Sequence, residues 1–191
     1  MTLEIDNPTE AQKDLELLDA ASWRTDRVNV LVYGDPGTGK TDFAARFPKP
    51  VILDTGENGQ LTVKKMLAEG RLDHNVPIIC TKSFTHAFNF INAPKQRLKS
   101  FFAGTKWERY DFQTLVLDNV SVAEEWCIAE VLATKGKSEM EFTELNTVKR
   151  RMTSLFRAAW NLDLNTVLIA HRYDGRAESK IMKERTKDHY S

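Results

Sequence analysis

One stretch of eight residues constrains the fold and chemistry of this chain more than any other. It reads Gly34-Asp35-Pro36-Gly37-Thr38-Gly39-Lys40-Thr41 and matches the phosphate-binding loop pattern G-x-x-x-x-G-K-[ST] at every fixed position. Glycines let such a loop fold around a phosphate, so that backbone N–H groups and the start of the next helix face the anion. The pattern predicts that all eight residues bind a nucleoside triphosphate. In that role Lys40 reaches the β- and γ-phosphates as a catalytic residue, and the Thr41 hydroxyl binds Mg²⁺.

The residues on either side of the loop have the composition that this mechanism requires. The run 28–33 is β-branched and apolar and leads into Gly34, as expected of a strand buried on both faces. A helix is expected from about Gly39 to Phe47, because Pro48 cannot continue it. The loop would thus connect a buried strand to a helix, which makes nucleotide binding the firmest inference from the sequence.

The rest of the chain continues to alternate between short apolar runs and longer segments of helical composition. Further strands are expected at 51–54, 76–80, 114–118 and 165–170, and helices at about 83–91, 122–133 and 145–160. Ser83 is the expected N-cap of the first of these helices. This alternation predicts an α/β fold with a mainly parallel sheet and helices on both faces. Ligands of such sheets bind beyond the carboxyl ends of the strands.

Two of the predicted strands end in polar residues at that edge of the sheet. Asp118 follows Leu115-Val116-Leu117, about 80 residues after the loop, where a carboxylate can hold Mg²⁺ together with Thr41. This is the Walker B role. His171 closes the last predicted strand, where its ring could sense the γ-phosphate by hydrogen bonding and pass the signal on to the next loop.

The four segments 33–41, 53–59, 115–119 and 168–171 together resemble RecA-type ATPases. More narrowly, they resemble the small phage nucleotide-binding proteins of the Sak group, RecA-like single-strand annealing ATPases. The resemblance covers about residues 28–171 and implies a three-layer P-loop NTPase with a RecA-like core. It also implies that the strand of His171 lies between the two Walker strands, that Glu57 prepares the attacking water, and that the protein assembles on single-stranded DNA during recombination.

Two departures from the family pattern leave the catalytic base open. Glu57 follows Asp54 by three residues, where the family glutamate commonly follows by two, and Asn119 stands where a serine is usual. AAA+ ATPases usually carry their water-activating glutamate at the position of Asn119. Glu57, in the loop after the second strand, is therefore the candidate base, and a solvated loop acid is the alternative.

The charge balance restricts any contact with DNA to a local patch. Lys plus Arg, 27, equals Asp plus Glu, 27, which excludes a strongly basic duplex-binding domain. Arg172, Tyr173, Arg176 and Lys180 follow His171 and combine one aromatic ring with cations, which suits single-stranded DNA; a solvated surface segment is the alternative. A second mixed cluster contains Lys95, Arg97, Lys99, Lys106, Trp107, Arg109 and Tyr110, and a third is Lys149-Arg150-Arg151.

Domain organisation and location follow from similar arguments. Residues 1–24 are expected to form an acidic helical segment ahead of a single ATPase domain at 25–191. No run approaches the length of a membrane span, and the start of the chain is acidic, unlike a signal peptide. Cys80 and Cys127, far apart in the sequence, fit a reducing compartment and are expected to be small buried residues. A cytoplasmic protein is expected, in the host cytoplasm if a phage encodes it.

The sequence therefore predicts a protein that binds ATP and Mg²⁺, hydrolyses ATP and acts on single-stranded DNA as a homo-oligomer, with a single-strand-binding or recombination protein as a further partner. Two other functions remain open. One is a loader or regulator that uses the nucleotide only as a switch. The other is a P-loop kinase for a small molecule, although Arg172, Arg176 and Arg185 are too scattered to make a good arginine lid.

Overall fold

The computed structural model describes residues 27–56, 59–92 and 94–172. At its centre is a five-stranded sheet in the order β1-β5-β4-β2-β3, in which every neighbouring pair is parallel. The strands are β1 (Asn29–Gly34), β2 (Pro50–Asp54), β3 (Ile78–Cys80), β4 (Thr114–Asp118) and β5 (Asn165–His171). This sheet confirms the predicted α/β fold class.

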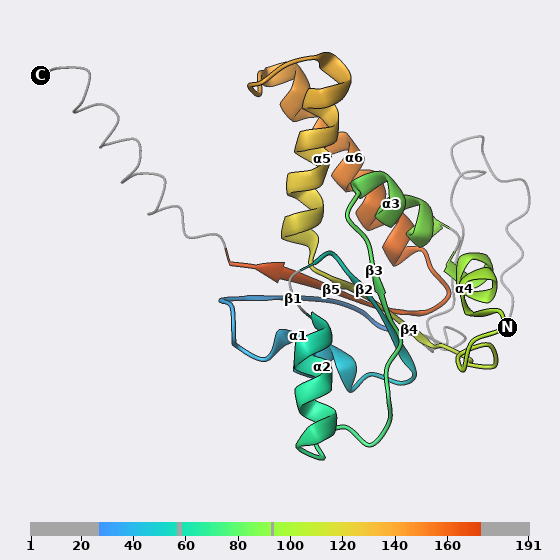
Figure 1. The fold of residues 1–191 in the computed structure, drawn as a ribbon. Helices are drawn as coiled ribbons and strands as arrows, with labels where there is room; N and C mark the ends of the chain where they lie inside the picture. The colour runs from blue at the N-terminus through green and yellow to red at the C-terminus, as the bar shows by residue number, and fades with distance from the viewer. Residues whose placement is uncertain (1–26, 57–58, 93, 173–191) are drawn as a thin grey trace, which may run out of the picture.

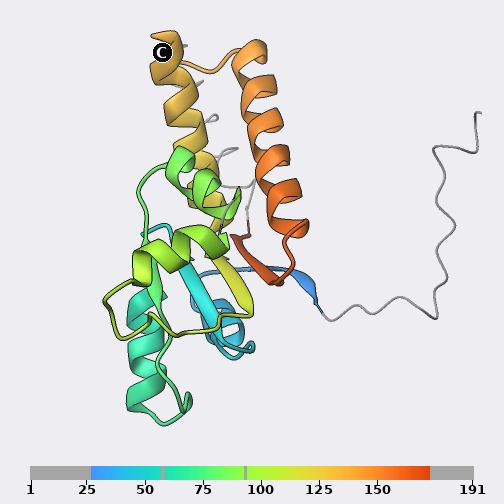
Figure 2. The same ribbon diagram turned by 90° about the vertical axis from the view of Figure 1, so that its right-hand side faces the viewer.

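Helices cover both faces of the sheet. The structure contains α1 (Lys40–Ala45), α2 (Gly59–Ala68), α3 (Phe84–Asn92), α4 (Pro94–Phe102), α5 (Val120–Lys135) and α6 (Phe142–Trp160). Figure 1 shows α1 and α2 below the sheet and α3, α5 and α6 above it. Figure 2 shows α4 beside α3, and α5 and α6 as a hairpin that extends away from the sheet.

The three central strands bury side chains on both faces, which explains their continuous apolar sequences. Ile52, Val116 and Val167 pack with the residues of α1 and α2, whereas Leu115 and Leu168 belong to the core beneath α3, α5 and α6. All five of these side chains are at most 1% exposed. At about 25 cal/mol per Å² of buried apolar surface, these two cores supply the main favourable term in folding.

The expectation that β1 is buried on both faces was wrong. Among the described residues, β1 pairs with β5 alone and forms one edge of the sheet, and its odd-numbered side chains are exposed. Leu31 is 51% exposed and Tyr33 is 73% exposed, while Val30 and Val32 on the other face are half-buried. An apolar run in a sequence does not distinguish a central strand from an edge strand that is exposed on one face.

Other differences from the sequence expectations are local. Helix α5 begins at Val120, two residues early, because the side chain of Asn119 accepts a hydrogen bond from Val122 N at 2.9 Å and caps the helix. Helix α4 was not anticipated; it begins at Pro94, a residue favoured at the first helical position. Cys127 is buried as expected, but Cys80 is exposed.

The remaining boundaries need only small corrections. Helix α1 ends at Ala45 rather than near Phe47, and α6 begins at Phe142 rather than Leu145. The N-cap role of Ser83 is confirmed, since its hydroxyl accepts a hydrogen bond from His86 N at 3.4 Å. The predicted N-terminal helix falls outside the described residues. Within them, no helix has the length and apolar character needed to cross a membrane.

Candidate nucleotide-binding site

The loop from Gly34 to Thr41 joins β1 to α1 at the carboxyl edge of the sheet. Gly37 and Gly39 have φ angles of 81° and 85°, in the left-handed region that favours glycine. The turn is closed by Thr38, whose N–H and hydroxyl both donate to Asp35 O, at 3.4 and 2.8 Å. The glycines at these positions are thus required by the backbone of the loop.

The ammonium of Lys40 is held inside the loop. Its Nζ donates to Gly34 O at 2.9 Å and to Asp35 O at 2.8 Å, and the residue is only 8% exposed. A buried cation next to a turn of backbone amides attracts an anion strongly, since little water screens it. Lys40 is therefore placed where the predicted phosphate contacts require it.

His171 lies next to Lys40 because of the strand order. β5 sits between β1 and β4, and His171 is in register with Gly34. Nδ1 of His171 lies 3.5 Å from Nζ of Lys40, and its backbone N–H donates to the Ser121 hydroxyl at 3.0 Å. The arrangement implied by the RecA resemblance, with the His171 strand between the two Walker strands, is what the structure has.

The proposed magnesium ligands also meet directly. Thr41 Oγ1 donates to Asp118 Oδ2 at 2.7 Å, and Asp118 is 5% exposed. A hydroxyl and a carboxylate are hard oxygen donors, which Mg²⁺ prefers. No group of three or more acidic, His or Cys residues that could hold a metal gathers in the described parts of the chain. Mg²⁺ commonly binds through one or two carboxylates and takes its other ligands from water and phosphate.

Sequence reasoning assigned no role in this site to Asp54. β2 and β4 are in register so that Asp54 stands opposite Asp118, and Asp54 is 1% exposed. Both carboxylates face Gly59: a Cβ atom there would lie 3.1 Å from Asp118 Oδ2 and 3.5 Å from Asp54 Oδ2. The signal was present, because the second predicted strand ends in Asp just as the fourth does.

These residues border a cavity of about 900 Å³. Its wall includes residues 36–41 of the loop together with Asp118 and His171. A volume of this size lies within the range of small-molecule sites, roughly 300–1,000 Å³. A second part of the wall is formed by Asp42, Gly56, Thr62, Lys65 and Arg71. Of these, only Gly56 lies in a segment that carries the RecA resemblance.

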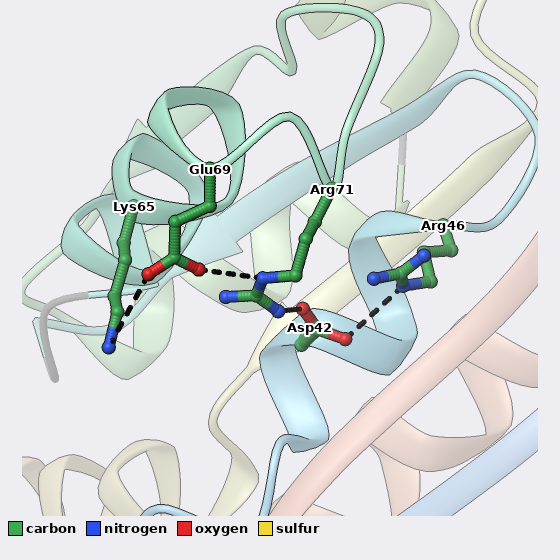
Figure 3. A network of polar contacts seen from close by, with 5 residues as sticks. All are labelled: Asp42, Arg46, Lys65, Glu69 and Arg71. Carbon is green, nitrogen blue, oxygen red and sulfur yellow. Dashed lines mark hydrogen bonds and ion pairs between the residues drawn. The ribbon is translucent and has the colours of Figure 1, made fainter.

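A chain of ion pairs links α1 to α2 at this second part of the wall (Figure 3). Asp42 accepts from Arg71 and, at 3.2 Å, from Arg46, while Glu69 accepts from Arg71 at 2.7 Å and lies 3.8 Å from Lys65. The hydrogen bond to Glu69 raises the pKa of the Arg71 guanidinium above its usual value. The network thus places two cations, Lys65 and Arg71, on the rim of the cavity.

Several predicted site residues lie elsewhere or cannot be placed. Arg172 is exposed directly after β5, and its N–H donates to Gly34 O at 3.1 Å. Glu57, Tyr173, Arg176 and Lys180 fall outside the described residues. The structure therefore brings together the loop, Asp118 and His171, and describes only the first residue of the predicted DNA segment.

The arrangement is suited to binding a nucleoside triphosphate with its magnesium. The loop amides and Lys40 would hold the phosphates, and Thr41 with Asp118 would hold the ion, with Asp54 beside them. Bound Mg²⁺ would supply charge neutralisation at the β- and γ-phosphate oxygens. A ring N–H of His171 would donate a hydrogen bond to an oxygen of the terminal phosphate.

Comparison with known proteins agrees with this geometry. A family model described as an AAA domain matches residues 26–190, most of the chain. No match was found among curated proteins. Together with the parallel sheet and the phosphate-binding loop, the family match gives the assignment: the chain belongs to the AAA-domain family of nucleotide-binding P-loop ATPases.

Proposed function

We propose that this protein binds ATP with Mg²⁺ and hydrolyses it, and that it uses this cycle to act on single-stranded DNA in phage-type recombination or annealing. The observation that carries the ATPase half is the meeting of Lys40, Thr41, Asp118 and His171, which come from three separate segments, at one cavity. Glu57 is the proposed base. Because Gly56 lines the cavity, the loop that continues into Glu57 starts at its wall.

The DNA half of the proposal is supported by the strand order and by the position of Arg172. The order β1-β5-β4 matches what the RecA and Sak resemblance implies for the nucleotide sensor. Arg172 is exposed immediately after that sensor, at the carboxyl edge of the sheet, and in the sequence it opens the segment 172–180, which mixes cations with Tyr173. A partner that binds single strands or takes part in recombination fits the same role, as does a cytoplasmic location.

A homo-oligomer is part of the proposal. Within the described ranges one edge of β1 is unpaired, Leu31 and Tyr33 on this strand expose 51% and 73% of their surfaces, and Val28, just before it, exposes 52%. Exposed apolar side chains on an open strand edge are characteristic of protein contacts. If subunits pack through β1, the neighbour would lie close to the loop that follows this strand.

One observation favours the second candidate function, a nucleotide switch without hydrolysis. The residue after Asp118 is Asn119, whose side chain is fully buried and caps α5, so no acid occupies this position. The function as an ATPase then depends on Glu57. Replacing Glu57 with Gln separates the two functions, because it removes the base without removing any proposed phosphate contact.

The experiment measures ATP turnover and ATP affinity for the wild type, Glu57→Gln and the control Glu124→Gln, an exposed acid on α5. We expect Glu57→Gln to keep its affinity and lose turnover by about a hundredfold or more, while the control stays at the wild-type level. Wild-type turnover should rise on adding oligo(dT). Equal turnover in both variants would remove Glu57 as the base; no wild-type turnover would favour the switch.

A further inference from the structure

A second cavity lies on the other face of the sheet from the nucleotide site. It has a volume of about 550 Å³ and is walled by the end of β3 and by α3 and α4. Leu53 and Ile79, at its base, belong to the core beneath α3, α5 and α6, whereas the nucleotide cavity lies on the side of α1 and α2. We name this cavity the α3–α4 groove. Because the two cavities occupy opposite faces, both can be filled at once.

The charged residues that line the groove are all basic. They are Lys82, His86 and Arg97, and no carboxylate is among the lining residues. Neither Lys82 nor Arg97 forms an ion pair with another residue of the described ranges. By contrast, Lys95 on the same helix as Arg97 lies 3.9 Å from Asp163. Lys82 and Arg97 thus give the groove a positive charge that no lining carboxylate neutralises.

Aromatic rings complete the lining. Phe90 is half-buried, and Phe101 is 61% exposed at the mouth of the groove. Trp107 and Tyr110, the aromatic residues of the mixed cluster in the sequence, do not line the groove. Their rings pack edge to face with centroids 5.4 Å apart, and the Tyr110 hydroxyl donates to Pro50 O. Burial raises the pKa of Tyr110 to about 12. Phe101 meets Phe102 edge to face, with ring centroids 6.1 Å apart, and still exposes 61% of its surface for stacking.

We infer that the α3–α4 groove is a binding site for single-stranded DNA. Lys82 and Arg97 would contact successive phosphates, and an unstacked base would lie on Phe101. A duplex keeps its bases stacked and so gains nothing from this ring, which favours a single strand over a double one. The inference rests on the proposed action on single-stranded DNA and adds a site built from other residues than the segment after His171.

The groove is also connected to the nucleotide site through one strand pair. Thr81, in its wall, donates its N–H to Asp54 O at 2.9 Å, and Cys80 is in register with Asp54. The carboxylate of Asp54 lies beside Gly59 and Asp118. DNA in the groove would therefore contact residues adjacent to those that surround the magnesium site.

The test uses fluorescence anisotropy with labelled oligo(dT) and the full-length protein, together with the variants Arg97→Glu, Phe101→Ala and Lys99→Glu. Lys99 is the matched control, because it is an exposed cation on the same helix, two residues from Arg97, and does not line the groove. Residues two apart on a helix point to nearly opposite sides. The ATPase rate without DNA and the melting temperature show whether each variant is folded.

We expect Arg97→Glu to bind the oligonucleotide roughly tenfold more weakly. The fall of log K with log salt should also become less steep, by about 0.7 in the slope, because one phosphate contact is lost. Phe101→Ala should also bind about tenfold more weakly, because a stacked base is lost. Lys99→Glu should bind like the wild type, and the ATPase rate without DNA should stay unchanged in all three.

Three results would overturn the site. If the wild type binds DNA but Arg97→Glu and Phe101→Ala bind as well as it does, the site is elsewhere and the proposed function stands. If Arg97→Glu and Lys99→Glu weaken binding equally and Phe101→Ala does not, the surface attracts any polyanion. If the wild type binds no DNA even in low salt, the groove and the DNA half of the proposed function fall together, while ATP binding is untouched.

Discussion

Replacing Gly59 with Ala perturbs the magnesium site without changing any residue that is proposed to touch the ligand. Gly59 begins α2, and an added Cβ would lie 3.1 Å from Asp118 Oδ2. Ordinary van der Waals contact for such a pair begins at about 3.4 Å. The carboxylate must therefore retreat by about 0.3 Å from a position that its 2.7 Å bond with Thr41 now fixes.

The expected effect on turnover follows from that displacement. A misplacement of about 1 Å can cost a factor of about 100 in rate. If the logarithm of the loss scales with distance, 0.3 Å costs roughly fourfold. Stability should change little: alanine is favoured over glycine in a helix by up to about 1 kcal/mol, which offsets the tight contact.

The assay compares kcat and the affinity for ATP with and without Mg²⁺ in the wild type, Gly59→Ala and Gln60→Ala. Gln60 is the next residue of α2 and is exposed, so its substitution controls for the change in helix propensity. We expect only Gly59→Ala to lose turnover and the Mg²⁺-dependent part of the affinity. Full activity in Gly59→Ala, or a fall in melting temperature that accounts for its loss, would refute the assigned role of Asp118.

Further predictions concern the metal, acid stability and the core. Thr41→Val should lose about tenfold in ATP affinity with Mg²⁺ and little without it, because the hydroxyl bonded to Asp118 is removed; a titration with and without Mg²⁺ measures this. Burial raises the pKa of Glu130, but hydrogen bonds from Thr85 and Ser83 lower it by more, so that it lies below its usual 4.5. A lowered pKa in the folded state stabilises the protein above about pH 4.5, and this contribution is lost as the pH falls through the folded value. Glu130→Gln should thus cost about 1–2 kcal/mol of unfolding free energy at pH 7 and much less at pH 3, as measured by denaturant melts; an equal cost at both would contradict this. Leu168→Ala, at a fully buried position of β5, should cost about 2–5 kcal/mol in the same melts.

Much of the fold and the centre of the site could be predicted because the relevant signals are local. Continuous apolar runs indicate strands that are covered on both faces, and this held for β2 and β4. The eight-residue loop is a specific motif that predicts nucleotide binding. Its glycines allow the backbone to form the turn, and Lys40 and Thr41 are the predicted ligand contacts. A polar residue that ends an apolar strand indicates the carboxyl edge, which correctly brought Asp118 and His171 to the loop.

The features that were missed depend on tertiary contacts. The apolar run predicts that Leu31 and Tyr33 are buried, but both are exposed on β1, which in the described part of the chain pairs with β5 alone. Asp54 ends its predicted strand just as Asp118 does, but its place opposite Asp118 depends on the register of β2 with β4. Helix α4 brings Arg97 and Phe101 to the same groove. The sequence indicates only a mixed cluster of cations and aromatic residues in this region, without Phe101.

The most direct test of the account is a calorimetric titration of ATP into the wild type and into Lys40→Ala, each with and without Mg²⁺. Lys40 is 8% exposed and bonded to two loop carbonyls, so its removal takes away the cation at the centre of the phosphate site. The account predicts that the wild type binds one ATP per chain, more tightly with Mg²⁺, and that Lys40→Ala loses at least about a hundredfold in affinity. Wild-type protein that binds no ATP, or Lys40→Ala protein that binds it equally well, would contradict it.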